Sequence, residues 1–278
     1  MDLYDGNRGF DFSGTHNVAS PIMQDENYYD MDDEKYPSLT TKFKKDLEAA
    51  LTDSGEIDFI THSTGGLVVR AYLKYCFDLQ EVHAKRGYYI NGKYKVNKIV
   101  LLGVPNHGTI LANRWFSRFG NSVVNLIYRV IYGIKEAVES AEGEIPDLNE
   151  GEINQLRVGS EFIKRLNRGI EALPYIDWYT IRGERNRWYI GNFLFSYWIL
   201  GIIPTFWPER SNDEVVQSKS VPLTGAINLK NRWLDHGALH DLDMEHSLKR
   251  VTSKKKKEKV KEAIIWLRNE LVKIMTTT

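Results

Sequence analysis

The feature that most constrains the fold is a short apolar run that meets a serine set among small residues. Residues 57–70 read Ile-Asp-Phe-Ile-Thr-His-Ser-Thr-Gly-Gly-Leu-Val-Val-Arg, and Ser63 separates the apolar run from an amphipathic continuation. This pattern predicts a strand, a sharp turn and a helix, because small neighbours allow the residue at the turn a strained backbone conformation. Such a turn presents the Ser63 hydroxyl above a helix N-terminus, where it is accessible as a nucleophile. The competing interpretation is an ordinary helix N-cap at Ser63 or Thr64.

Two blocks of sequence carry a family resemblance. Residues 58–73 resemble the nucleophile elbow of the α/β-hydrolase lipases, in which a His-Ser-x-Gly-Gly core precedes an apolar helix, although Thr61 stands where the elbow pattern has glycine. Residues 98–109, which end in Pro-Asn-His-Gly-Thr, are similar to the next strand of those lipases and the loop after it. The resemblance implies an α/β fold: an α/β-hydrolase-like, mostly parallel sheet covered by helices, with an inserted helical cap or lid.

The order of predicted elements agrees with that fold. A helix begins at Ser38 or Thr40, strands follow at 57–60, 98–103, 175–182 and 226–233, and a helix covers about 255–275. Residues 1–4 are a candidate for a further short strand. Alternating strands and helices predict a mostly parallel sheet that is covered on both faces.

Length and composition exclude some classes of function. The 278 residues are enough for a single domain, residues 1–278, with room for an inserted cap. The 37 basic residues balance the 37 acidic ones, so no net field favours nucleic acid, and we expect a small-molecule lipid or ester as partner. Cys76 is the single cysteine, which rules out an internal disulfide. No charged-then-apolar leader opens the sequence, and we therefore expect a cytoplasmic location.

Two stretches interrupt the regular alternation. Residues 110–173 exceed what a crossover needs and are predicted to form a cap or lid, and residues 186–208 form an apolar, aromatic insertion near the mouth of the site. The second stretch is a poor membrane span because it contains Asn192 and Pro204. Three interpretations of this second stretch are left: it forms a wall of an acyl pocket, it is a surface in peripheral contact with lipid, or it packs between cap and core. The candidate substrate-binding residues in these stretches are Trp115, Phe195 and Trp198.

A nucleophilic serine needs a base and an acid, which in this fold follow it in the order acid, then histidine. Asp213 lies in Ser-Asn-Asp-Glu-Val-Val, which resembles the Asp-Gly-Val-Val loop of the family, and is the predicted acid; a turn cap is the alternative. His236 falls where a strand should end and is the predicted base, with His240 and then His246 as rivals. His62 should not be the base, because neighbouring side chains on a strand face opposite ways. We expect His62 to support the elbow and to lie among the substrate-binding residues.

These residues predict a serine hydrolase of carboxylic esters of lipids, similar to triacylglycerol lipases and carboxylesterases, that forms an acyl-enzyme and uses no cofactor or metal. The Thr64 N–H should be one oxyanion donor. The family takes its second donor from a loop after an early strand, and no such strand precedes residue 57 at the family's spacing. Either a segment precedes this sequence, or another loop such as residues 8–10 supplies the donor, or the protein is a weak hydrolase. The alternatives are an acyltransferase or phospholipase with the same triad, or a lipid-binding protein on a hydrolase fold.

Overall fold

A mostly parallel sheet organises the residues that the computed structural model describes, which are 38–51, 54–109, 112, 152–185, 211, 213, 215–241, 247–248, 251 and 253–277. Within these residues the strands β1 (Gly55–His62), β3 (Tyr94–Leu102), β4 (Asp177–Gly183) and β5 (Ile227–Asn231) lie in that order, all parallel. The short strand β2 (Tyr89–Ile90) pairs antiparallel with β3. The sheet and its covering helices confirm the predicted α/β class with a mostly parallel sheet covered by helices on both faces.

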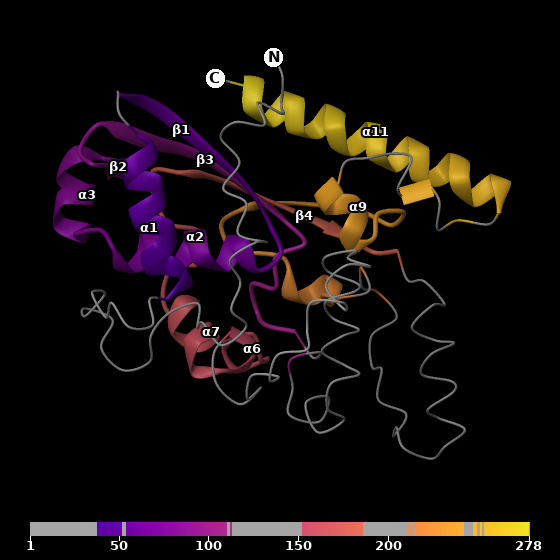
Figure 1. Cartoon of the computed structure of the whole chain (residues 1–278), viewed down its shortest axis with the longest axis horizontal. Coiled ribbons are helices and arrows are strands. Elements are labelled where there is room, and N and C mark those ends of the chain that lie inside the picture. Colours follow the sequence, from indigo (N-terminus) through magenta and orange to yellow (C-terminus); the bar gives the residue numbers. More distant parts are fainter. Residues whose placement is uncertain are drawn as a thin grey trace, which may run out of the picture.

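The two faces of the sheet are covered by different helices, because successive side chains of a strand point to opposite faces. On β3, Ile99 and Leu101 join a core with α1 (Leu39–Ala50), α2 (Thr64–Tyr75) and α7 (Glu161–Leu166). The alternate residues Val100 and Leu102 join a second core with α9 (His236–Asp241) and α11 (Lys254–Thr276). In Figure 1, α11 crosses the top of the molecule, and α1 and α2 lie below the strands.

Local sequence explains where the first of these helices begins. Ser38 precedes α1, and its Oγ accepts a hydrogen bond from the Thr41 N–H at 3.1 Å, which satisfies one of the free donors of the first turn. Within α1, Phe43 and Leu47 are buried on one face, as the periodicity predicts. Three further short elements are α3 (Leu79–Lys85), α6 (Glu152–Gln155) and the 3₁₀ turn η3 (Ser218–Ser220).

The predicted insertion at 110–173 is described only over residue 112 and residues 152–173. This part contains α6 and α7, and Phe162, Ile163 and Leu166 of α7 are buried in the same core as α2. The remainder of that insertion, the aromatic stretch 186–208 and the predicted strand 1–4 lie outside the described residues, so the cap stays a prediction. Among the helices that are described, none combines the length and apolar character that a membrane crossing needs.

The carboxyl ends of the parallel strands meet at one edge of the sheet. The ladder continues one residue beyond β1 and β3, because the Ser63 N–H donates to Leu102 O at 3.0 Å and the Gly103 N–H donates to Ile181 O at 2.9 Å. The loops that follow β1, β3, β4 and β5 therefore lie side by side. In open α/β sheets this edge is where ligands bind.

Candidate active site

Ser63 lies at the turn between β1 and α2 in a backbone conformation that only glycine adopts readily. Its φ is 52° and its ψ is −133°, and its side chain makes no capping hydrogen bond to α2. The N-cap interpretation of Ser63 is therefore wrong. Strain of this kind costs about 1–3 kcal/mol and is typical of functional sites. The side chain is nearly buried, with 7% of the residue exposed.

The glycine two positions into α2 explains how the turn can be so sharp. A Cβ at Gly66 would lie 2.3 Å from Cγ2 of Val104, so glycine lets the first turn of α2 approach the loop that follows β3. At Gly65 a Cβ would meet no atom within 4 Å. The two glycines of the motif therefore differ in role, because only Gly66 is required by packing.

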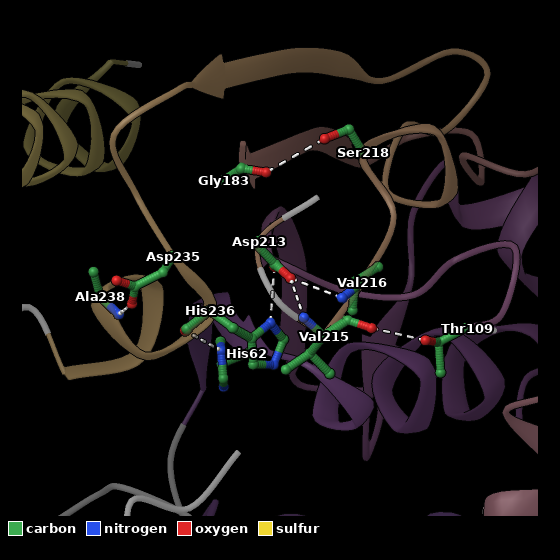
Figure 2. Close-up of polar contacts among 10 residues, drawn as sticks. All are labelled: His62, Thr109, Gly183, Asp213, Val215, Val216, Ser218, Asp235, His236 and Ala238. Carbon is green, nitrogen blue, oxygen red and sulfur yellow. Dashed lines mark hydrogen bonds and ion pairs between the residues drawn. The ribbon is translucent and has the colours of Figure 1, made fainter. Parts of the chain in front are cut away.

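A buried histidine and a buried aspartate face each other at the same edge of the sheet. His236 Nδ1 lies 2.8 Å from Asp213 Oδ2, and both residues have no exposed surface (Figure 2). Because a carboxylate only accepts hydrogen bonds, the proton of the neutral imidazole is assigned to Nδ1. His236 Nε2 is buried and has no hydrogen-bond partner within the described part of the chain. The arrangement leaves a lone pair on Nε2 that can accept a proton.

The other oxygen of the Asp213 carboxylate is fixed by backbone donors. Asp213 Oδ1 accepts from the Val215 N–H at 3.1 Å and from the Val216 N–H at 2.7 Å. The Asp213 N–H in turn donates to Val216 O at 3.2 Å. Asp213 thus both caps a turn and holds the imidazole, so the two interpretations of this residue are compatible.

Two glycines make room for this pair. Gly103, with φ of 57°, follows β3, and a Cβ there would lie 3.0 Å from Asp213 Oδ2 and 3.1 Å from His236 Nδ1. A Cβ at Gly183, the last residue of β4, would lie 2.3 Å from Leu234 O. Any side chain at Gly103 would therefore displace the aspartate or the histidine.

A buried ion pair that the sequence analysis missed holds the segment before His236. Arg185 Nη1 lies 2.8 Å from Asp235 Oδ2, and the Asp235 Oδ1 accepts from the Ala238 N–H at 2.9 Å in the first turn of α9. The Arg185 N–H also donates to Leu234 O at 3.0 Å. The ion pair joins the end of β4 to the loop that carries His236. An acidic residue just before the predicted base and an arginine just after a predicted strand were the available signals.

The loop after β3 holds the segment that carries Asp213. Thr109 Oγ1 donates to Val215 O at 2.8 Å, and the His107 N–H donates to Ser220 O at 3.0 Å. The His107 ring is neutral with its proton on Nε2, because Nε2 lies 2.9 Å from Pro222 O while Nδ1 accepts from Asn167 Nδ2 at 3.2 Å. The Pro-Asn-His-Gly-Thr block thus supports the acid through the backbone of its loop. Ser218 Oγ also lies 3.5 Å from Gly183 O, at the end of β4.

His62 lies closer to His236 than expected. Its Nε2 is 3.1 Å from His236 O, and the two ring centroids are 4.4 Å apart. The rule that neighbouring strand side chains face opposite ways does not predict this packing of His62 beside His236. The alternation of a strand no longer applies here, because Ser63 has left the extended conformation.

The rival histidines differ in position. His240 is exposed, and its ring centroid lies 5.1 Å from that of His62. His246 and the aromatic candidates Trp115, Phe195 and Trp198 lie outside the described residues.

No group of three or more histidine, cysteine, aspartate or glutamate side chains that could hold an ion occurs in the described ranges.

The Thr64 N–H belongs to the first turn of α2, where backbone donors have no partner within the helix.

The solved structures that resemble this chain include lipases and esterases, all at low sequence identity. No family model matches the chain, and no curated protein matches it in sequence. A solved lipase of Bacillus licheniformis, BlEst2 in mature form, is 19% identical with a TM-score of 0.43, and the match covers 72% of this chain and 65% of that one. A lipase of Staphylococcus hyicus is 14% identical with a TM-score of 0.43, covering 86% and 73%. A metagenomic carboxyl esterase is 16% identical with a TM-score of 0.41, covering 69% and 48%.

The matched region is thus slightly under two thirds of the mature Bacillus lipase, and it is 36% of the propeptide form of the same protein. At these identities and TM-scores the similarity does not assign an activity.

Proposed function

We propose that this protein is a serine hydrolase of carboxylic esters in which Ser63 is the nucleophile, His236 the base and Asp213 the acid. The observation that carries the proposal is the buried imidazole whose Nδ1 contacts Asp213 at 2.8 Å while its Nε2 has no partner among the described residues. A histidine in that state is ready to take a proton from a nucleophile. Ser63, which is strained and free of a capping hydrogen bond, follows the residue that contacts His236.

The mechanism follows from where charge develops. His236 Nε2 takes the Ser63 proton as Oγ attacks the ester carbonyl, and Asp213 stabilises the imidazolium that forms. The alcohol leaves with a proton from Nε2, and water then attacks the acyl-enzyme by the same route. The oxyanion is stabilised by the Thr64 N–H at the positive end of α2, a contribution of about 3 kcal/mol for each such donor.

The substrate we propose is a lipid ester, in the manner of a triacylglycerol lipase or carboxylesterase. The apolar and aromatic sequence of residues 110–173 and 186–208 supports this substrate class, since acyl chains require apolar walls. We also propose that the protein needs no cofactor, works in the cytoplasm and makes peripheral contact with lipid. Transfer of the acyl group to an alcohol, or cleavage of a phospholipid ester, would use the same three residues.

Covalent labelling with a fluorophosphonate tests the nucleophile directly, because only an activated serine reacts. We expect one adduct by intact mass, mapped to the peptide that contains Ser63, and none in Ser63→Ala. Ser253→Ala is the matched control, because Ser253 is exposed and makes no capping hydrogen bond. Absence of an adduct on the wild-type chain would contradict the proposal.

The choice of base is tested by comparing two histidine variants. We expect His236→Ala to slow labelling of Ser63 by at least a hundredfold, in the range of general-base contributions of about 10²–10⁴. His240→Ala should label at nearly the wild-type rate. The reverse ranking would transfer the role of base to His240.

A further inference from the structure

His62 occupies a position that the triad itself does not explain. It is the last residue of β1, directly before Ser63, and its Nε2 contacts the backbone oxygen of His236 at 3.1 Å. The two imidazole rings lie with centroids 4.4 Å apart and planes inclined by 50°. Figure 2 shows His62 beside the backbone of His236, while Asp213 lies above the imidazole in this view.

The contact shows which ring nitrogen of His62 carries a proton. A carbonyl oxygen only accepts hydrogen bonds, so Nε2 must carry the proton and donate it to His236 O. Burial lowers the pKa of His62 well below its ordinary value of 6.5, and the neighbouring His236 and His240 lower it further. His62 is therefore neutral at neutral pH, and it adds no positive charge beside an imidazole that must itself become positive.

The backbone of His236 is held at both of its polar groups. Its N–H donates to Asp213 O at 2.8 Å, and its carbonyl accepts from His62. The side chain is held by the third contact, from Nδ1 to Asp213 Oδ2 at 2.8 Å. Two of these three contacts come from the acid loop, and His62 supplies the one that comes from the strand of the nucleophile.

We propose that His62 is a positioning residue: its Nε2–H bond to His236 O and its ring packing hold the base in register with the end of β1, and hence with Ser63. This inference rests on the proposed function. It assigns His62 a role in orienting the base, separate from the substrate contact that the sequence suggested. A positioning residue of this kind should affect turnover more than substrate binding.

Two nearly isosteric substitutions separate the hydrogen bond from the packing. His62→Met fills similar space without a donor, whereas His62→Gln can place an amide N–H near the position of Nε2. With a soluble ester we expect His62→Met to lower kcat about tenfold, the equivalent of one lost hydrogen bond, with KM unchanged. His62→Gln should recover most of that loss. His83→Met is the control, because His83 is exposed on α3 and contacts Tyr175 instead.

A spectroscopic measurement tests the same inference without turnover. The His236 Nδ1 proton, shared with Asp213, should give a downfield proton NMR signal in the wild type. We expect this signal to broaden in His62→Met and to be sharp in His62→Gln and in His83→Met. If His62→Met does not fold, His62→Asn replaces it, since its amide is too short to reach His236 O.

The outcomes distinguish the two proposals. A wild-type chain with neither adduct nor turnover contradicts the proposed function, and the NMR signal then decides the role of His62 alone. Equal kcat values and equal signals in the wild type and His62→Met would overturn the inference. Equal impairment of His62→Met and His62→Gln would also overturn it, because the donor would then not matter.

Discussion

The proposed nucleophile and the proposed acid–base pair are built in different ways within the same sheet edge. Ser63 is positioned by its immediate neighbours in sequence: β1 ends at His62, α2 begins at Thr64, and the turn between them is strained. Asp213 and His236 are 23 positions apart and are joined by hydrogen bonds between loops. The first region depends on backbone shape, and the second depends on buried polar contacts.

This difference predicts how each region fails. Backbone shape is disturbed by adding atoms where the chain packs closely, as at Gly66. A network of buried polar groups is disturbed by removing one partner, because the other is left without compensation. The elbow should therefore respond to steric substitutions, and the acid–base side to substitutions that change charge or hydrogen bonding.

The largest expected effect comes from Asp213→Asn. The Val215 and Val216 N–H groups bind Oδ1 and require an oxygen there, so the new amide nitrogen would face His236 Nδ1. The imidazole would then carry its proton on Nε2 and could not act as base, which lowers kcat by about 10⁴-fold in a triad. Steady-state hydrolysis of a soluble ester measures this loss. Asp177→Asn, at an exposed position at the start of β4, is the control, and a loss below about tenfold would contradict the assigned role.

The contrast also explains what the sequence could predict. The elbow was predictable because its strand, serine, glycines and helix are contiguous, and the parallel strands followed from their apolar runs. Asp213 and His236 were predicted as acid and base through the order of residues in a resembling family, not through their contacts. The two-residue strand β2 carries too little pattern to be recognised.

Other parts of the site could not be predicted because they depend on distant segments. Arg185 and Asp235 are 50 positions apart, and only the fold shows that they pair. The closeness of Gly103 to Asp213 and His236 requires three loops to be in place. The packing of His62 beside His236 was not predicted, because the rule for strands was applied at the residue where the strand ends.

The second prediction concerns the stability of the acid–base side. Arg185→Met would remove the guanidinium that lies 2.8 Å from the Asp235 carboxylate, whose side chain is 3% exposed. Breaking a buried pair in this way costs about 3–5 kcal/mol in the free energy of unfolding. Urea denaturation would measure the loss. The double variant Arg185→Met/Asp235→Asn should lose less than Arg185→Met alone, because neither charge of the pair remains. An equal or larger loss would show that the buried Asp235 charge is not the cause.

The third prediction concerns the elbow and compares its two glycines. Gly66→Ala would press a Cβ against Val104, so the free energy of unfolding should fall by about 1–3 kcal/mol, as in other overpacked cores. Gly65→Ala meets open space within α2 and should raise the free energy of unfolding by up to about 1 kcal/mol. The same urea experiment measures both. Equal effects at the two positions would mean that close packing at Val104 does not shape the elbow.

The smallest effect is expected where the two regions meet, at His62. Its pKa is held below the ordinary value of 6.5 in the folded protein, so below that pH the unfolded chain takes up a proton that the folded chain does not. The unfolded state then binds more protons, and the free energy of unfolding falls with decreasing pH by up to about 1.4 kcal/mol per pH unit from this group. His62→Gln should remove this contribution, so urea denaturation from about pH 7.5 to about pH 5.5 should give a shallower slope than in the wild type. His83→Gln controls for the loss of an imidazole. Parallel slopes in the wild type and His62→Gln would mean that His62 takes up a proton in the folded protein as readily as in the unfolded chain. The assignment of His62 as a neutral hydrogen-bond donor to His236 O would then be wrong.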